Sequence, residues 1–495
     1  MSGNPETVKL EFETALDNEL ARGVAGKKGR IVEAEWLDPA ELTGPRWQYR
    51  NEKNEVAGLI LGYRNGRGIG SMDNRHILTA AGSRGGKGVS LIVPNLLMYD
   101  GSVLAIDPKG ELARITARAR RQKGQKVVVL DPFGESGLAA GRFNPLEELD
   151  PAGQHVKDDA GQIADALIVA NERDPHWTDS ARILIKALIL YTLTLPAEER
   201  TLITVWRLLS ATHPLVTELA RRSECTGRAA LFLLLRTCGD AFDGTIASSG
   251  VNFGQMADKE LASVFSTALT QLEFLDSKAM EATLVGNDIK LSELKSRKAT
   301  LYLCLPATRM GTHARWLRVI INLALIAFER TKVETGVPGL MVLDEFAVLG
   351  HMKSIETAAG LMAGFGVKLW VVLQDLSHIK RLYRDSWETF IGNAGIMTYW
   401  ANSDKMTLDY VSDKLGQTSV VVDRKSDTTM NQRLAGSIGS RDELRVQKLA
   451  PPHELEAMLE RDKRRVLVKV AGQSPVILQR IHYYEDAPFK GLFDK

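Results

Sequence analysis

A glycine-rich turn between two apolar segments is the feature that most restricts how this chain can fold. Ile77–Ala80 is an apolar run of the kind typical of a buried strand, and an apolar, helix-like segment begins near Val89. The turn between them reads AGSRGGKG over residues 81–88. Glycines at a strand-to-helix turn allow successive backbone N–H groups to face one anion, so the segment predicts a phosphate-binding loop.

This loop departs from the common pattern G-x-x-x-x-G-K-[ST] at two positions. Ala81 replaces the first glycine and Gly88 replaces the hydroxyl residue, so magnesium would be held by phosphates, waters and another side chain. Lys87 is expected to reach the β- and γ-phosphates of a nucleotide. The alternative interpretation is a glycine-rich turn with a surface lysine. The expected nucleotide contacts are Gly82, Ser83, Arg84, Gly85, Gly86, Lys87, Gly88 and Val89.

A second motif in the later half of the chain favours the nucleotide interpretation. The apolar run 339–343 ends in Asp344 and Glu345, and Leu369–Leu373 ends in Gln374. We expect Asp344 to hold Mg²⁺, Glu345 to activate water and Gln374 to sense the γ-phosphate. Alone, the acid pair could be a helix cap and Gln374 a surface residue. Together with the loop, the three positions predict an ATPase with ATP and Mg²⁺ as cofactors.

Short strand-like runs alternate with helical segments, which predicts a mostly parallel α/β sheet. From 151 to about 293 this alternation gives way to apolar residues at helical spacing. We therefore predict one α/β domain interrupted by an all-α domain, with divisions at 1–58, 59–150, 151–295 and 296–495. The expected strands are Ile77–Ala80, Ser102–Ile106, Val127–Leu130, Ala299–Leu305, Leu340–Leu343, Lys368–Leu373 and Ile396–Trp400.

Three other segments carry weaker local expectations. The glycine-rich stretch 62–74 is typical of loops and turns, and the polar stretch Val420–Arg445 predicts an exposed loop. The basic run Arg114–Lys126 is more typical of a solvated helix face than of a DNA contact.

The charge balance and the hydropathy argue against two broad classes of protein, those that bind nucleic acid through bulk charge and those that span a membrane. Lys plus Arg total 63 against 61 for Asp plus Glu, so nucleic acid is not bound through bulk charge, although a local basic channel remains open. The apolar runs Ile183–Leu195 and Val319–Phe328 are shorter than the roughly 20 residues needed to span a bilayer. The first residues lack the pattern of a signal peptide. We therefore expect a cytoplasmic chain without a membrane anchor of its own.

With these residues placed, the chain resembles the type IV secretion coupling proteins, the TraG/TraD group of conjugation ATPases. The resemblance covers approximately Leu59 to Phe489 and includes the loop and the acid pair already described. Further segments match the family in the same order along the chain. They are Ile92–Leu97, Gly101–Glu111, Asp131–Gly134, Phe143–Leu146, Leu343–Phe346, Gln374–Ser377 and Gly392–Gly395. The family tolerates alanine at the loop start and glycine after the lysine.

The resemblance implies a RecA-like P-loop domain interrupted by an all-α domain. It also implies hexameric rings that bind ATP at subunit interfaces and feed single-stranded DNA with a relaxase, or effector proteins, to a secretion channel. Asp107, Lys109 and Glu111 match a family motif beside the nucleotide, although a strand end followed by a helix cap explains them equally well. Residues 361–368 lack the arginine that relatives place there to act across the subunit interface, so this arginine is missing, moved or replaced by Lys368. Arg381 and Arg384 are other candidates, although each is more typical of a solvated helix residue.

Many members of this family carry N-terminal transmembrane helices, so the expected lack of an anchor raises the question of how this chain reaches the membrane channel. We expect peripheral association with the inner membrane through an integral membrane partner, with the first sixty residues as a candidate tether. Two rival functions stay open. One is an FtsK- or HerA-like DNA translocase, and the other is a non-catalytic adaptor that uses the nucleotide fold to recruit substrates.

Overall fold

The computed structural model describes residues 34–170, 175–332, 336–425 and 440–494, and it divides into two compact units. The larger unit comprises Asp38–Asn402 and Leu459–Lys495, and the smaller comprises Met1–Leu37 and Ser403–Met458. Over half of the candidate N-terminal tether, residues 1–33, lies outside the described residues. Each unit is described by itself below.

The larger unit is built on an 11-stranded sheet whose central part is parallel. Seven neighbouring strands are parallel, and all seven coincide with the predicted runs. This confirms the predicted α/β class with a mostly parallel sheet. In spatial order they are β9 (Ala394–Trp400), β3 (His76–Ala81), β8 (Val367–Leu373), β7 (Gly339–Leu343), β4 (Val103–Asp107), β6 (Ala299–Cys304) and β5 (Lys126–Leu130).

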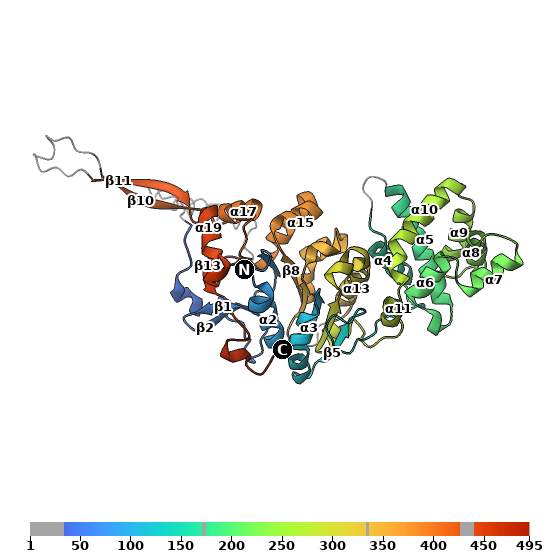
Figure 1. Cartoon of the computed structure of the whole chain (residues 1–495), viewed down its shortest axis with the longest axis horizontal. Helices are drawn as coiled ribbons and strands as arrows, with labels where there is room; N and C mark the ends of the chain where they lie inside the picture. The colour runs from blue at the N-terminus through green and yellow to red at the C-terminus, as the bar shows by residue number, and fades with distance from the viewer. Residues whose placement is uncertain (1–33, 171–174, 333–335, 426–439, 495) are drawn as a thin grey trace, which may run out of the picture. The chain divides into compact units, whose positions relative to one another are not determined.

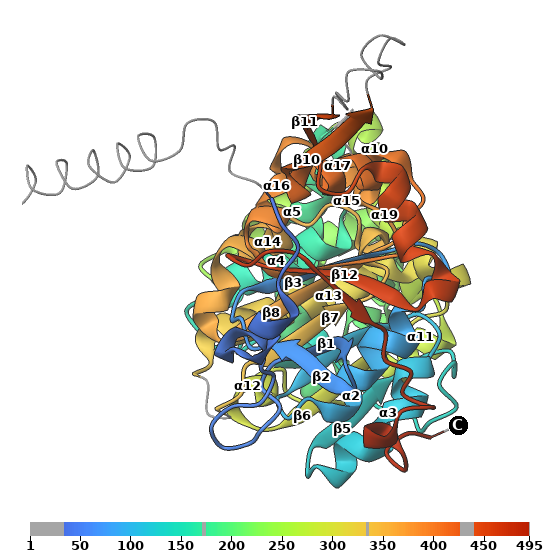
Figure 2. The same ribbon diagram turned by 90° about the vertical axis from the view of Figure 1, so that its left-hand side faces the viewer.

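Helices cover the parallel strands, because a parallel connection must cross over the sheet. Every residue of β3, β4, β6, β7 and β8 is accordingly buried. Figure 2 shows β3, β8 and β7 side by side in the middle of the larger unit. The covering helices are α2 (Val93–Met98), α3 (Glu111–Gln122), α13 (Met310–Arg330), α14 (Lys353–Leu361), α15 (Leu376–Tyr383) and α16 (Trp387–Gly392).

Four antiparallel strands extend the sheet beyond β9, in the order β12, β13, β1 and β2. They are β1 (Leu59–Arg64), β2 (Arg67–Ser71), β12 (Arg465–Val470) and β13 (Val476–Gln479). The prediction of loops over 62–74 was therefore wrong for most of that stretch. Gly70 serves close packing in the hairpin, because a Cβ on this residue would lie 2.3 Å from Leu59 O and 2.6 Å from the Tyr49 Cβ.

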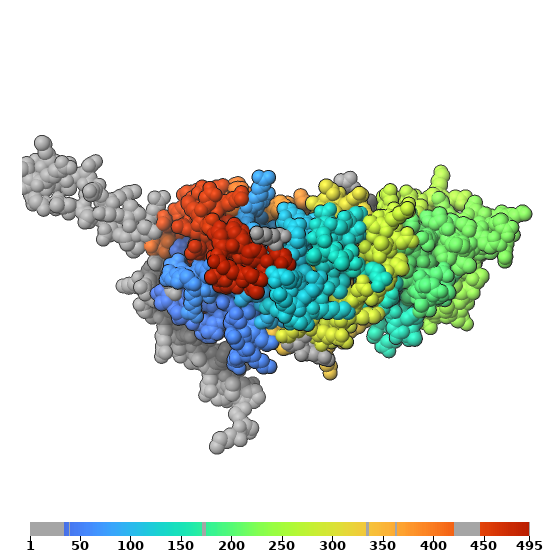
Figure 3. Space-filling view, turned by 60° about the horizontal axis from the view of Figure 1, so that its bottom comes forward, coloured from blue at the N-terminus to red at the C-terminus, as the bar shows by residue number. Residues whose placement is uncertain are grey.

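The C-terminal residues return to the N-terminal part of the same unit. The Arg118 Nε donates to Asp494 Oδ1 at 2.6 Å, and β13 pairs with β1. Figure 3 shows this contact as red C-terminal atoms lying against blue and cyan ones. Segments nearly four hundred residues apart are thus joined in one unit.

Between β5 and β6, every regular element among the described residues is a helix. Threonines begin two of these helices, where Thr201 and Thr226 accept hydrogen bonds from the backbone N–H groups of Thr204 and Ala229. Figure 1 shows α5 to α10 gathered to one side of the sheet. The predicted domain boundaries stay a prediction. The helices are α4 (Val156–Leu167), α5 (Pro175–Thr194), α6 (Leu202–Leu209), α7 (Pro214–Arg222), α8 (Gly227–Arg236), α9 (Thr245–Gly254), α10 (Asp258–Leu272), α11 (Lys278–Leu284) and α12 (Glu293–Ser296).

The basic run Arg114–Lys126 forms α3 and the start of β5. Its Arg120 is fully buried rather than solvated, and its guanidinium donates to the carbonyls of Leu96, Tyr99 and Gly101. The predicted solvated face was therefore wrong for this residue, which instead ties the end of α2 to the sheet.

In the smaller unit, α17 (Lys405–Leu415) is followed by the paired strands β10 (Gln417–Lys425) and β11 (Ser440–Lys448) and by most of α19 (Pro452–Leu459). The ladder runs from Gln417↔Lys448 to Lys425↔Ser440 without a break. The prediction of an exposed loop over Val420–Arg445 was therefore wrong at both ends of the stretch. Residues 426–439, between the two strands, lie outside the described part.

Candidate nucleotide-binding and catalytic site

The glycine-rich loop follows β3 and leads into η3 (Gly88–Ile92), a π-helical turn that continues as α2. The Gly82 N–H donates to Trp400 O at 2.9 Å, and the Gly85 N–H donates to Gly82 O at 2.8 Å. Gly86 lies at φ +89°, where a side chain would be strained. The loop therefore curls tightly above the end of β9.

Two of the glycines are required by close approach of neighbouring backbone. A Cβ on Gly82 would come within 2.3 Å of Ala401 O, and one on Gly85 within 2.8 Å of Gly82 O. By contrast, a Cβ on Gly88 would meet nothing within 4 Å. Space near the loop therefore does not explain why glycine, rather than a hydroxyl residue, follows the lysine.

The loop lysine meets both acids of the second motif. The Lys87 Nζ lies 2.8 Å from Asp344 Oδ1 and 2.9 Å from Glu345 Oε1. Burial lowers the pKa of Lys87, but the two carboxylates outweigh it and the net shift is upward. Burial also raises the pKa of Asp344, against the opposing charge of Lys87. Removing Lys87 would leave two neighbouring carboxylates without their cation in a mostly buried site.

Gln374 joins the same cluster from the next strand. Its Nε2 donates to Glu345 Oε2 at 3.1 Å, and its backbone carbonyl accepts from the Asn402 Nδ2 at 3.0 Å. Glu345 itself has a left-handed backbone with φ +53°, a conformation that costs free energy and is common at functional sites.

The order of the strands explains why these residues meet. The loop follows β3, Gln374 follows β8 and the acid pair follows β7, and these three strands are neighbours in the sheet. Because parallel strands end at one edge, the three motifs converge outside their carboxyl ends, where α/β proteins commonly bind ligands.

Of the trio that begins at the last residue of β4, Asp107 alone is buried, whereas Lys109 and Glu111 are exposed. Burial raises the pKa of Asp107 to about 6, against the backbone N–H groups of the following turn, and the charge of Asp344 adds to the rise. Asp107 Oδ2 accepts from the Ala113 N–H at 2.8 Å. This residue therefore holds the first turn of α3, and its pKa also responds to the charge of Asp344.

Other residues of the segments that resemble the family lie away from Lys87 and the acid pair, and they make hydrogen bonds within the protein. The Asn95 side chain exchanges hydrogen bonds with the backbone N–H and carbonyl of Ile60. Asp131 accepts from the N–H groups of Glu135 and Ser136, and the Asn144 Nδ2 donates to Arg200 O at 2.7 Å. These residues fix the surrounding segments rather than a ligand.

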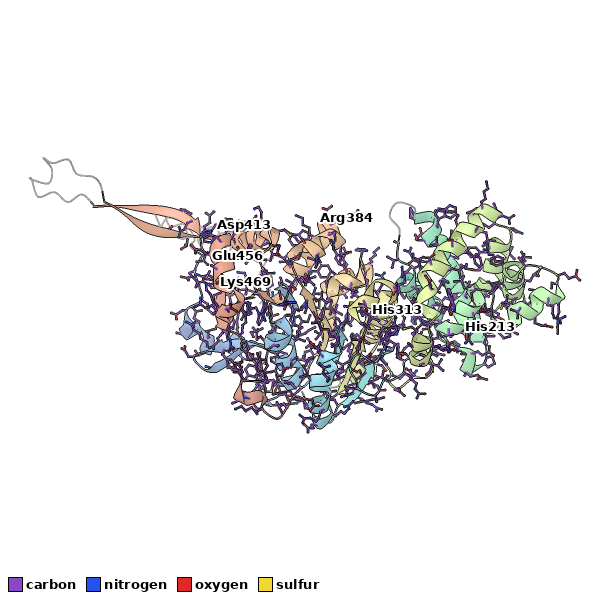
Figure 4. All side chains as sticks on the ribbon, in the orientation of Figure 1. His213, His313, Arg384, Asp413, Glu456 and Lys469 are labelled. Carbon is purple, nitrogen blue, oxygen red and sulfur yellow. The ribbon has the colours of Figure 1, made fainter. Side chains whose placement is uncertain are left out.

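Lys368 does not fit the suggested role of an interface residue. It lies near the start of β8, is only 2% exposed, and donates to Ala57 O at 3.5 Å. A side chain buried at this position cannot reach across to another subunit, so this alternative was wrong. Arg381 and Arg384 are exposed, the latter on the turn that follows α15 (Figure 4). They remain the candidates.

Sequence reasoning missed Arg480, which touches the loop from just beyond β13. Its Nη1 donates to Gly85 O at 2.7 Å, and its guanidinium lies 5.1 Å from the Trp400 ring centroid. Burial lowers its pKa to about 10, so it stays charged at neutral pH. No local pattern marks this arginine, because its contacts join residues almost four hundred positions apart.

Comparison with known protein families gives a match over most of the chain. The family described as type IV secretory system conjugative DNA transfer matches residues 36–494. VirD4 of Rhizobium radiobacter is 25% identical, over 93% of this chain and 65% of the relative. The conjugal transfer protein TraG of Agrobacterium fabrum is 26% identical, over 95% of this chain and 72% of the relative. The chain thus spans slightly less than two thirds of the VirD4 relative.

Solved structures agree on the fold. A structure described as the bacterial conjugative coupling protein TrwBdeltaN70 aligns with a TM-score of 0.64 at 14% identity, over 91% of this chain and 94% of that chain. Another, described as TrwB in complex with a non-hydrolysable ATP analogue, aligns with a TM-score of 0.63 at 14% identity, over 94% and 98% of the two chains. The likeness at this identity concerns the fold.

Proposed function

This chain belongs to the type IV secretory system conjugative DNA transfer family, and from that premise we propose that it is an ATP-hydrolysing coupling protein. It would recruit DNA–protein or protein substrates and drive them to a type IV secretion or conjugation channel. The observation that carries the proposal is the meeting of Lys87 with Asp344 and Glu345 at 2.8–2.9 Å, beside Gln374. The family match favours this function over an unrelated DNA pump.

The side chains fit distinct roles in phosphoryl transfer. Residues 82–89 would surround the phosphates, with Lys87 exchanging its carboxylate partners for phosphate oxygens. Glu345 would accept a proton from the attacking water, and Gln374, which holds Glu345, would link its position to the state of the nucleotide. A structure of TrwB is described in complex with ADP and Mg²⁺, which supports the choice of nucleotide.

The chemistry of the donor set fits Mg²⁺ at Asp344. Among the described residues no group of three or more His, Cys, Asp or Glu side chains could hold a metal alone. A single protein carboxylate completed by waters and phosphates is, however, a common way to bind Mg²⁺. When bound, the ion neutralises charge on the phosphate oxygens. Asp344 would orient it from the end of β7.

The proposed partners follow from the family. They are single-stranded DNA with a relaxase or effector proteins as cargo, components of the secretion channel, and an integral membrane protein as anchor. We propose that the chain forms a homo-hexamer at the cytoplasmic face of the inner membrane. No helix in the described ranges combines the length and apolarity needed to cross a bilayer.

The decisive experiment is ATP hydrolysis by the purified protein, with and without single-stranded DNA. We expect Glu345→Gln and Lys87→Ala each to lower the rate at least about 100-fold, because they remove the proton acceptor and the phosphate-binding cation. Matched controls are Glu388→Gln and Lys353→Ala, exposed positions that should hydrolyse ATP at the wild-type rate.

The outcomes separate the proposed function from its rivals. Full hydrolysis by Glu345→Gln would contradict the catalytic assignment, and a wild-type protein without hydrolysis under either condition would favour the adaptor. Transfer in a deletion strain, scored separately for DNA and for effector protein, then identifies the cargo. A strain that transfers both normally without this chain would favour the DNA pump.

A further inference from the structure

We propose that Arg480 is a positioning residue for the phosphate-binding loop and that the C-terminal strand pair β12–β13 thereby forms part of the nucleotide site. The inference rests on the proposed nucleotide-binding function. It concerns a residue that no sequence motif marks, and it makes the affinity for nucleotide depend on a segment far from the loop in the chain.

The contacts of Arg480 tie three backbone segments together. Its Nη1 donates to Gly85 O at 2.7 Å, its Nε to Arg465 O at 2.6 Å and its Nη2 to Leu459 O at 3.3 Å. The side chain is buried, with 4% of its surface exposed. One face of the guanidinium also packs on the Trp400 ring.

Only a planar group with several donors can make this set of contacts. The guanidinium presents five N–H groups in a rigid fork, whereas a lysine ammonium is a compact point charge without the fork. Arg465 O and Leu459 O hold the fork in place from the side of β12. Because these two contacts fix the guanidinium, its Nη1 holds Gly85 O of the loop in a constant position.

Fixing Gly85 O also fixes the next N–H group of the loop. In a planar trans peptide the carbonyl and the following N–H point in opposite directions. With Gly85 O held by Arg480, the Gly86 N–H is directed away from the arginine. Gly86 has no Cβ to restrict its backbone and lies at a φ of +89°, so without an anchor this part of the loop could adopt many conformations. An anchored carbonyl therefore orients donors that a phosphate requires.

The loop is held from a second point next to Arg480. Trp400 O accepts from the Gly82 N–H, and the Trp400 ring is the surface on which Arg480 packs. The Trp400 Nε1 in turn donates to Thr398 Oγ1 at 2.9 Å within β9. The loop is thus supported from below by β9 and by the residue that follows β13.

The test measures nucleotide binding and turnover in the full-length protein carrying Arg480→Lys. We expect the Kd for ATP and for ADP and the KM for ATP to rise about tenfold, the effect of losing one hydrogen bond to a charged group. The kcat at saturating ATP should stay within about threefold, because a loop that is harder to order weakens ground state and transition state alike. An Arg480→Lys protein that binds ATP within twofold of the wild type would overturn the proposal.

Two further measurements separate positioning from general destabilisation. Arg464→Lys changes an exposed arginine that immediately precedes β12 and pairs with Glu485, and this variant should bind ATP like the wild type. In Arg480→Ala, millimolar methylguanidinium should restore ATP affinity without raising the melting temperature measured in the absence of nucleotide. Failure of that rescue would count against the proposal even if Arg480→Lys does not fold.

The same experiment distinguishes this inference from the function on which it rests. If the wild-type protein binds no ATP, the proposed function fails. If the wild type binds ATP, Lys87→Ala loses binding and Arg480→Lys keeps it, only the role of Arg480 fails.

Discussion

Two lysines lie at opposite edges of the same parallel sheet and have opposite electrostatic surroundings. At the carboxyl edge, Lys87 contacts two carboxylates within 3 Å, and its pKa is raised. At the amino edge, Lys368 lies at the second position of β8, and burial lowers its pKa to about 8. The two differ in how their charge is balanced.

The surroundings of Lys368 explain the difference. Among the described residues, no ion pair involves its Nζ, and the charge of Asp73 opposes the burial only in part. Asp73 is already held by Arg75, whose Nη2 lies 2.6 Å from Asp73 Oδ2. A buried charge with weak compensation destabilises the fold.

The sheet therefore contains buried charge for different reasons at its two edges. At the carboxyl edge Lys87, Asp344 and Glu345 form a set of charges whose partners can be exchanged, which suits a site for phosphates. At the amino edge no proposed step uses Lys368, so its buried charge lowers the stability of the fold without serving the proposed activity. The loss of hydrolysis expected for Lys87→Ala is the largest effect by which the two positions should differ.

Replacing Lys368 by methionine should stabilise the protein. The side chains have similar length, and the variant removes a charge whose pKa lies about 2.5 units below its usual value, equivalent to about 3 kcal/mol. We expect the free energy of unfolding at pH 7, measured by urea denaturation, to rise by about that amount. ATP hydrolysis by Lys368→Met should match the wild type. A less stable variant would show that the charge of Lys368 does not destabilise the fold. A variant without ATP hydrolysis would show that Lys368, like Lys87, is needed for activity.

The stabilisation should also disappear as the pH rises. In the folded protein Lys368 loses its proton near pH 8, but in the unfolded chain it does so near pH 10.5. Between these values the unfolded state binds more protons, so wild-type stability rises with pH relative to the variant. The advantage of Lys368→Met should be complete below pH 8 and shrink steadily towards pH 10. A constant difference measured across that range would show that packing, rather than charge, separates the two proteins.

The smallest of these effects is expected for Gln374→Leu, at the other end of β8. The substitution removes the 3.1 Å hydrogen bond to Glu345 but leaves both carboxylates on Lys87. We expect kcat to fall about tenfold, or about 1.4 kcal/mol, with stability within about 1 kcal/mol of the wild type. An unchanged kcat would show that Lys87 alone positions Glu345.

The sequence predicted the parallel part of the sheet but not its antiparallel extension. Strands buried on both faces leave continuous apolar runs, which is why all seven were recognised. In β1 and β2, glycines at 62, 68 and 70 suggested turns, whereas they allow close approach of backbone and of Tyr49. Such packing reasons depend on neighbours that a local pattern does not contain.

The candidate site shows the same division. Lys87, Asp344 and Gln374 each follow a recognisable strand, so their convergence could be predicted from the rule that parallel strands end at one edge. Arg480 follows a short antiparallel strand and acts through backbone carbonyls, which have no side-chain signature. Asp107 was recognised only as a member of a motif, because the burial that raises its pKa to about 6 has no local signature in the sequence.

The place of β3 in the sheet has a consequence for how the chain is made. Its partners are β8 and β9, so Ile77 pairs with Trp370 and Ile396, which the ribosome adds about three hundred residues later. At translation speeds of 5–20 residues per second, an apolar strand waits for at least about fifteen seconds before its neighbours exist. During that interval the nascent chain exposes two unpaired strand edges and is a natural client for chaperones that bind such segments.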